Sequence, residues 1–354
     1  MSEPLFPTTV IGSLPRPMWV RELIEDRKAG RISEEEAGPH LDRAIESAIE
    51  LQERAGIEEI TDGEWRRESY VKLFAERVRG FKADLLPSGG LPYPAVVDPL
   101  EYYRPLAVEE LAYIRPRTER RVKVTLPAPF IIGWRMWHPE HSKKAYPTRE
   151  LLMEACVPIL REEVEQLRDA GADTVQLDEP WLAVLVDPVY CRDQGIDNSR
   201  KEMDRAVDLV NQVVDGIDGI STSMHLCHAH FDRKHGAEGA YDPIMPSLHN
   251  ARVDMVSLEY ATPVAGGVDS LAGFPDSVRL GFGCVDHCDR NVETPAAIIA
   301  RVEDAMRYVD SSRIALHPDC GFAPSVQNPM DLDEAYLKLK AMAEASEQLR
   351  DKYG

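Results

Sequence analysis

Short apolar runs alternate with polar residues and with longer stretches of helical periodicity, and this pattern recurs eight times along the chain. Apolar runs of this length, bounded by Gly, Pro or polar clusters, predict strands. The predicted strands are residues 8–11, 58–61, 121–126, 174–177, 220–224, 255–258, 279–285 and 314–316. The predicted helices include residues 32–55, 149–170, 200–214 and 295–308. Ser33 and Glu36 have the spacing of a capping box at the start of the first of these helices, and Gly56 marks its end.

Strands that alternate with helices predict a parallel sheet, and eight such units are the number that closes a (β/α)8 barrel. We therefore expect an α/β fold that consists of a single (β/α)8 TIM barrel domain over residues 1–354. Residues 80–120 interrupt the alternation and are rich in Pro, Gly and Tyr, so we expect an inserted loop or hairpin there. An open doubly wound sheet is the alternative. It loses support because no Gly-x-Gly-x-x-Gly motif follows the first strand.

Composition and charge narrow the possible partners. The chain has 354 residues, 44% of them hydrophobic, and a formal net charge of −20. That charge argues against nucleic acid or an anionic membrane as a partner. No run of 18 apolar residues and no signal-peptide pattern occurs, so we expect a cytoplasmic protein. Six cysteines are too few for a disulfide scaffold in a chain of this length and are expected to be thiols or metal ligands.

Nearly every predicted strand ends in a polar side chain, and in a barrel those ends share one rim. His225 and Cys227 are two residues apart at a strand end, so their side chains are expected to point the same way. Glu259 and Cys320 end two further strands. The four donor atoms are N, S, O and S, a set that suits zinc, and the sequence therefore predicts a Zn²⁺ site at the rim. The nearby His228, His230 and His235 are expected in a solvated polar loop.

The motifs at the strand ends resemble those of one known family. They are Ile11-Gly12-Ser13, Asp62-Gly63-Glu64, Asp178-Glu179-Pro180, His225-x-Cys227, Ser257-Leu258-Glu259 and Pro318-Asp319-Cys320-Gly321. In this order, over about residues 8–345, they resemble the catalytic zinc barrel of the cobalamin-independent methionine synthases in its short, single-barrel form. The resemblance implies a zinc enzyme that moves a methyl group from a folate nitrogen to the sulfur of homocysteine. It places the zinc ligands on the same four residues.

The resemblance also implies which residues hold and protonate the substrates. Ile11, Ser13, Glu64 and Asp178 match the positions that hold the amino acid, and carboxylates suit its ammonium group. The family has a proton-donating His after the seventh strand. Here Cys288 stands in that position, with His287 one residue earlier and Asp286 retained. Asp286 and His287 are therefore the candidate catalytic acids, and which of them acts is open.

Alternatives remain for the electrophile and for the chemistry. The family's Trp-Ser pair after the third strand is absent, whereas Tyr146-Pro147 and residues 320–323 resemble epoxyalkane:coenzyme M transferase, in which zinc activates a thiol that opens an epoxide. A zinc hydrolase and a purely structural metal are further alternatives, although two cysteine ligands are unusual for hydrolytic zinc. The expected partners are a small thiol, homocysteine first, and a methyl or alkyl donor. The donor and the oligomeric state stay open.

Overall fold

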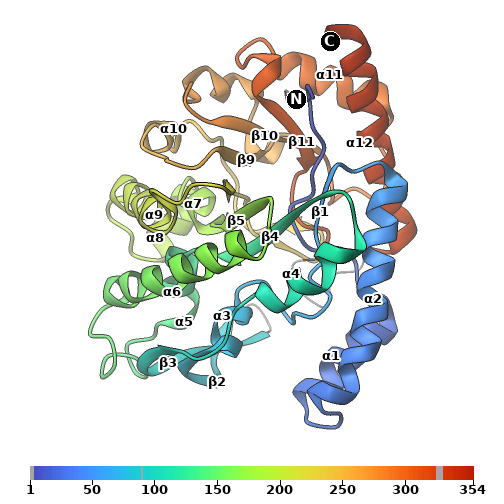
Figure 1. Cartoon of the computed structure of the whole chain (residues 1–354). Helices are drawn as coiled ribbons and strands as arrows, with labels where there is room; N and C mark the ends of the chain where they lie inside the picture. Colours follow the sequence, from blue (N-terminus) through green and yellow to red (C-terminus); the bar gives the residue numbers. More distant parts are fainter. Residues whose placement is uncertain (1–3, 89–90, 324–329) are drawn as a thin grey trace.

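Seven parallel strands form one curved sheet at the centre of the molecule (Figure 1). The computed structural model describes residues 4–88, 91–323 and 330–354. In spatial order the strands are β1 (Glu59–Ile60), β4 (Arg121–Pro127), β5 (Thr174–Asp178), β6 (Ser221–His225), β9 (Met255–Glu259), β10 (Arg279–Val285) and β11 (Ile314–Pro318). Each of them falls on a strand predicted from the sequence, within one or two residues at the ends.

The first predicted strand closes the sheet into a barrel. Thr8 forms a parallel bridge with Leu316 of β11, and Thr9 forms one with Glu59 of β1. The ladder is short because side chains of other strands take the next backbone carbonyls: Lys123 Nζ donates to Val10 O over 2.9 Å. The predicted (β/α)8 barrel is therefore confirmed, with its eighth strand reduced to these bridges.

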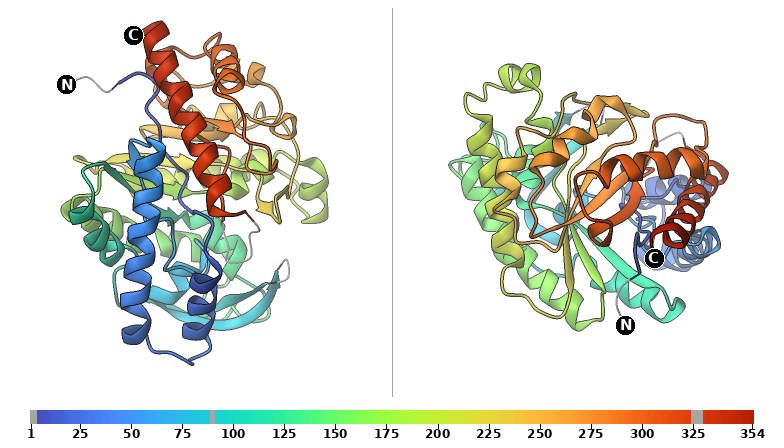
Figure 2. Two further views of the ribbon diagram at one scale, coloured as in Figure 1. Left: turned by 90° about the vertical axis from the view of Figure 1, so that its right-hand side faces the viewer. Right: turned by 90° about the horizontal axis from the view of Figure 1, so that it is seen from above.

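Helices surround the sheet, as the view from above shows (Figure 2). They are α1 (Met18–Lys28), α2 (Glu34–Ala55), α3 (Lys72–Arg77), α4 (Val108–Ile114), α5 (Pro129–Met136), α6 (Arg149–Asp169), α7 (Pro180–Val184), α8 (Pro188–Asp193), α9 (Ser199–Val214), α10 (Met245–Leu248), α11 (Pro295–Ala305) and α12 (Leu332–Tyr353). The predicted capping box is present, since the Ser33 hydroxyl accepts from Glu36 N and the Glu36 carboxylate accepts from Ser33 N. Gly56 ends α2 with φ of 89°. Among the described residues, none of these helices is long and apolar enough to cross a membrane.

The segment that interrupts the alternation contains a hairpin and a helix. β2 (Val78–Ser88) pairs antiparallel with β3 (Leu91–Tyr102), which confirms the hairpin expected within residues 80–120. Helix α4 was not predicted there. The carboxylate of Glu163 in α6 accepts from the backbone N–H groups of Leu106, Ala107 and Val108 at its start. Because this cap comes from a residue more than 50 positions away, local sequence does not reveal it.

Candidate metal centre and substrate pocket

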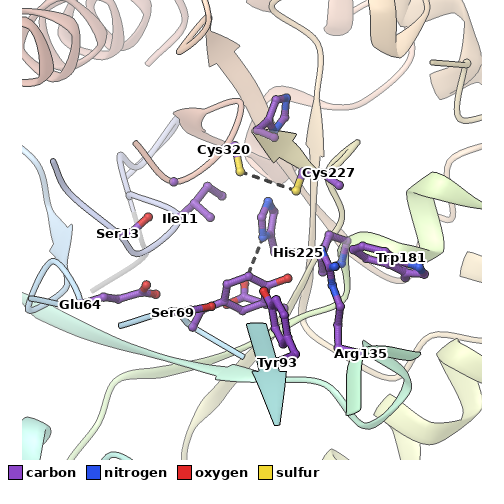
Figure 3. Close-up of a pocket in the computed structure, with 16 residues that line it drawn as sticks. Ile11, Ser13, Glu64, Ser69, Tyr93, Arg135, Trp181, His225, Cys227 and Cys320 are labelled. Carbon is purple, nitrogen blue, oxygen red and sulfur yellow. Dashed lines mark hydrogen bonds and ion pairs between the residues drawn. The ribbon is translucent and has the colours of Figure 1, made fainter. Parts of the chain in front are cut away.

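A pocket opens at the carboxyl ends of the strands. In a (β/α)8 barrel this rim is the usual place of the active site. Seven of the residues expected at the site line the pocket (Figure 3). They follow the bridges of Thr8 and Thr9 or lie at or just after the ends of β1, β5, β6 and β11. They are Ile11, Ser13, Glu64, Asp178, His225, Cys227 and Cys320. The barrel thus brings together residues that are up to 309 positions apart (11 to 320).

Two thiols face each other on the wall of this pocket. The Sγ atoms of Cys227 and Cys320 are 3.6 Å apart (Figure 3), and neither cysteine is in a disulfide. Two sulfur ligands about 2.3 Å from one tetrahedral zinc would be about 3.8 Å apart, so the spacing fits a shared metal. The hydrogen bond from the Cys320 thiol lowers the pKa of Cys227 well below its ordinary value and raises that of Cys320.

Glu259 and a histidine that the sequence analysis placed elsewhere complete a compact group with these thiols. One ligand atom each of Cys227, His230, Glu259 and Cys320 lies within 4.8 Å of the others, and all four residues are buried. His228 holds the Glu259 carboxylate, because its backbone N is 3.0 Å and its Nδ1 is 2.7 Å from Oε2. The other oxygen, Oε1, is 3.2 Å from His230 Nε2.

His225 stands beside this group and is oriented by Asp178. His225 Nδ1 is hydrogen-bonded to Asp178 Oδ1 over 3.0 Å. A carboxylate on one ring nitrogen commonly directs the other nitrogen to a metal. Burial lowers the pKa of His225 and the neighbouring charge of Cys227 raises it, with a net rise to about 10. The structure therefore offers two histidines, His225 and His230, around one pair of thiols.

The expectation of a solvated loop for the histidines after Cys227 is wrong for two of them. His228 is fully buried and His230 is 7% exposed, whereas His235 is half-buried. The short antiparallel pair β7 (His230–Phe231) and β8 (Lys234–His235) turns the chain back over the rim. A run of histidines directly after a predicted ligand pair was itself a signal for this role, but their polar surroundings in sequence predicted a loop in solvent.

The donor atoms around the thiols fit a cation. Within the described part of the chain, His225 Nε2 and His230 Nδ1 are buried without a hydrogen-bond partner, while His230 Nε2 and Glu259 Oε1 face each other over 3.2 Å. Each such atom costs about 1–3 kcal/mol if it stays unsatisfied. Thiolate, imidazole and carboxylate are the ligands that zinc takes in proteins. The residues present therefore fit a zinc ion, which would bind Glu259 Oε1 and one histidine nitrogen together with the two thiols.

Glu64 is held in the pocket in an unusual backbone conformation. Its φ is 58°, and the Thr125 hydroxyl donates to Oε1 over 2.8 Å. Gly12 allows this approach, because a Cβ there would lie 2.6 Å from Glu64 Oε1. Burial raises the pKa of Glu64 to about 7, against the opposing effect of Arg67. Glu64 Oε2 is buried and has no hydrogen-bond partner among the described residues.

Ser13 is fixed against the segment that carries Cys320. Its hydroxyl accepts from Ala323 N over 3.2 Å, and its backbone O accepts from Phe322 N over 2.8 Å. Gly321 gives the space for this contact, since a Cβ there would lie 2.4 Å from Ser13 Oγ. Ser13 and Cys320 are therefore positioned together.

The two candidate proton donors lie outside the pocket lining. His287 is fully buried, and burial lowers its pKa well below the ordinary value. Its ring meets the ring of His230 edge-on, with centroids 4.1 Å apart. Asp286 Oδ1 accepts from the backbone N of Cys288 over 2.7 Å. The catalytic role expected for Asp286 and His287 stays a prediction.

The outer wall of the pocket is aromatic and was not predicted. Tyr70, Tyr93 of the β2–β3 hairpin and Trp181 of α7 line it together with Arg135. The Arg135 guanidinium lies 4.2 Å from the ring centroid of Trp181 and 5.0 Å from that of Tyr93. Sequence reasoning had no local signal for Tyr93, because its place depends on how the hairpin folds back over the rim.

Comparisons with known proteins agree with this architecture. The family model described as "Cobalamin-independent synthase, Catalytic domain" matches residues 6–348. A protein named methionine synthase from Saccharolobus solfataricus is 29% identical over 98% of this chain and 96% of its own. Another from Sulfurisphaera tokodaii is 30% identical over 90% and 86%. The solved structure of a B12-independent methionine synthase from Shewanella sp. W3-18-1, in complex with selenomethionine, is 23% identical and superposes with a TM-score of 0.79 over 98% of both chains.

Proposed function

Because the chain belongs to the family of the cobalamin-independent synthase catalytic domain, we propose that it is a zinc-dependent methyltransferase acting on a small thiol. The proposed acceptor is homocysteine, and the product is methionine. The proposed methyl donor is a methyltetrahydrofolate-type compound or methylcobalamin. Relatives named methionine synthase, matched over nearly the whole chain, support this assignment. The observation that carries it is the pair of thiols 3.6 Å apart beside a pocket lined by Glu64 and Asp178.

The residues proposed to hold zinc are His225, Cys227, Glu259 and Cys320. Zinc supplies a positive charge that keeps a substrate thiol deprotonated near neutral pH, where a free thiol with a pKa of about 8.5 is mostly protonated. Asp178 orients His225 through Nδ1 and leaves Nε2 for the metal. His228 holds one oxygen of Glu259, so the other oxygen would be the zinc ligand that the substrate sulfur could replace.

The amino-acid end of homocysteine is proposed to bind between Ser13, Glu64 and Asp178, beside Ile11. Glu64 Oε2 has no hydrogen-bond partner among the described residues and can pair with the substrate ammonium. Thr125 and Gly12 fix the position of the other Glu64 oxygen. This arrangement holds the substrate by its charged end and directs the sulfur toward Cys227 and Cys320.

The methyl donor is proposed to lie against the aromatic wall. Tyr93 and Trp181 offer ring faces on which a flat donor can stack, and Arg135 offers a positive charge for an anionic group. Asp286 or His287 remains the proposed proton donor to the leaving group. The pH profiles of His287→Ala and Asp286→Asn decide between them, because only removal of the true acid abolishes the alkaline limb of the profile.

A turnover screen tests the proposed function. It pairs homocysteine or coenzyme M with methyltetrahydrofolate, its polyglutamates, methylcobalamin or a small epoxide, using the zinc-loaded protein. We expect methionine from homocysteine with one of the methyl donors, and loss of turnover by more than about 100-fold in Cys227→Ser. Cys191→Ser is the matched control, since Cys191 is a buried residue of α8 whose thiol donates to Leu185 O.

Other results of the screen would reassign the chemistry. Turnover only with coenzyme M and the epoxide would replace the proposal with epoxide opening. No turnover of any thiol, and no proton release on mixing with thiols, would favour the hydrolase alternative. The cytoplasmic location expected from the sequence stays a prediction.

A further inference from the structure

A second group of soft ligand atoms lies next to the proposed zinc site. One atom each of His230, His235 and Cys288 lies within 4.8 Å of the others. His230 is shared with the group that contains Cys227 and Glu259. If His225 serves the proposed zinc, as the family motif implies, His230 is left with a buried Nδ1 that lacks a hydrogen-bond partner among the described residues, while its Nε2 lies 3.2 Å from Glu259 Oε1. No step proposed for methyl transfer uses His235 or Cys288.

The β7–β8 pair places the two histidines on one face. His230 and His235 are directly opposite each other in this antiparallel pair. Directly opposed residues project to the same side of a sheet, so both rings face the same space. Their ring centroids are 4.5 Å apart. The short pair thus presents two imidazoles toward the loop that follows β10.

Several contacts fix Cys288 in front of these rings. Its Sγ is 3.9 Å from His235 Nδ1, while His235 Nε2 is 3.3 Å from the Thr262 hydroxyl. Arg233, in the turn between β7 and β8, donates to the backbone oxygens of Cys288 over 3.0 Å and Asp289 over 2.7 Å. The same turn that carries the histidines therefore also holds the cysteine loop. A hydroxyl on the far nitrogen of His235 directs Nδ1 toward the sulfur.

We propose that His230, His235 and Cys288 form a second binding site for a soft divalent metal ion such as Zn²⁺, beside the proposed zinc site. Two imidazoles and a thiolate are preferred ligands of zinc, and three protein ligands leave a fourth position open for water or a substrate atom. His235 and Cys288 are half-buried, so an ion can reach them, whereas His230 is buried on the inner side. This site does not depend on the proposed methyl transfer.

Metal stoichiometry tests the second site. The protein is stripped with a chelator and equilibrated with Zn²⁺, and bound zinc per chain is measured by mass spectrometry after dialysis. We expect two equivalents in the unaltered protein and one in Cys288→Ser and in His235→Asn. The matched control is His249→Asn, because the His249 ring is exposed and its Nε2 is hydrogen-bonded to Gly273 O, and this variant is expected to keep two equivalents. Circular dichroism verifies that each variant is folded.

Co²⁺ titration separates this proposal from the proposed function. We expect the second equivalent to add sulfur-to-cobalt charge-transfer absorption, which is lost in Cys288→Ser while the absorption from Cys227 and Cys320 stays. One equivalent in the unaltered protein, or two equivalents in both variants, would overturn the second site and leave the proposed function intact. Cys227→Ser should lose the first equivalent and keep the second. A failure of turnover in this variant would then be assigned to the first zinc site and not to the site of His235 and Cys288.

Discussion

At the scale of single residues, the buried carboxylate of Glu64 costs stability, and its proposed role in binding the substrate explains this cost. Burial raises the pKa of Glu64 from 4.5 to about 7, so the native state holds this proton more tightly than the unfolded chain. Stability therefore falls as pH rises from 4.5 to 7 and is lowest, on this account, above pH 7. This loss of stability is expected if the buried carboxylate has the proposed role of pairing with the substrate ammonium.

Glu64→Gln tests this reading. We expect the free energy of unfolding at pH 8 to rise by about 1–3 kcal/mol, because about 1.4 kcal/mol corresponds to each pKa unit. The gain should vanish below pH 4.5, and the KM for homocysteine should rise at least tenfold. Urea unfolding at pH 4 and pH 8 measures the first effect. The exposed Glu140→Gln is the control, and a gain that does not change with pH contradicts the assignment.

Gly12 is the second residue whose role can be isolated. In Gly12→Ala the new Cβ would lie 2.6 Å from Glu64 Oε1 and 3.0 Å from Thr125 Cγ2. We expect the carboxylate to move and kcat/KM to fall about 10- to 100-fold. Steady-state kinetics measure this. Gly38→Ala in α2 has nothing within 4 Å, so it should keep activity and gain about 0.5–1 kcal/mol. Equal activity of the two variants would show that the space at Gly12 does not position the Glu64 carboxylate for catalysis.

Sequence alone could predict those residues of the candidate site that directly follow a strand. His225, Cys227 and Cys320 follow strands whose apolar runs are clear, so the rim could be assembled before any geometry was known. His230 could not be placed in this way, because it enters the site through a turn with φ of 52° at Ala229. Sequence patterns of two or three polar residues do not reveal such a turn.

At the scale of elements, the β2–β3 hairpin contributes directly to the site. Tyr93 from β3 lines the pocket beside Arg135, although the sequence indicated only an inserted loop or hairpin and not its contact with the site. Helix α4, which follows the hairpin, is capped by Glu163 of α6, a residue more than 50 positions away in the sequence. Periodicity predicted the central strands and long helices well, because burial repeats along each of them. It missed elements that depend on a distant partner.

Tyr93→Leu tests the contribution of the hairpin. We expect the KM of the methyl donor to rise about tenfold, since base-like rings lose about 1–3 kcal/mol when an aromatic stacking partner is removed. The KM of homocysteine should change less than threefold. Initial rates with each substrate varied in turn measure both constants. Tyr103→Ala is the control, because Tyr103 is 45% exposed near the end of the same hairpin. Equal shifts for both substrates would refute a donor-specific role.

At the scale of the whole molecule, both ends of the chain are tied to the same closed sheet. Ser346 Oγ of α12 donates to Phe6 O over 2.6 Å, and Arg350 Nε donates to Leu5 O over 2.6 Å. The bridges of Thr8 and Thr9 then join the first and last strands of the barrel. These contacts support the prediction that residues 1–354 form one domain.

Differential scanning calorimetry tests the one-domain prediction. We expect a single heat-absorption peak, because the buried hydrophobic side chains of the described residues form one continuous core. Thr9→Pro, which removes the backbone donor to Leu316 O, should lower the midpoint without splitting the peak. The control is Ser47→Ala, because Ser47 is solvent-exposed and lies outside the bridges. Two resolved peaks would indicate separate units.

The central claim is that Cys227 and Cys320 hold a zinc ion which receives the substrate sulfur. X-ray absorption at the zinc edge of the loaded protein measures this directly, by counting the sulfur atoms around the metal with and without homocysteine. The account predicts two sulfur neighbours in the free enzyme and three after homocysteine is added, at about 2.3 Å. A count that stays at two in the presence of saturating homocysteine would contradict it.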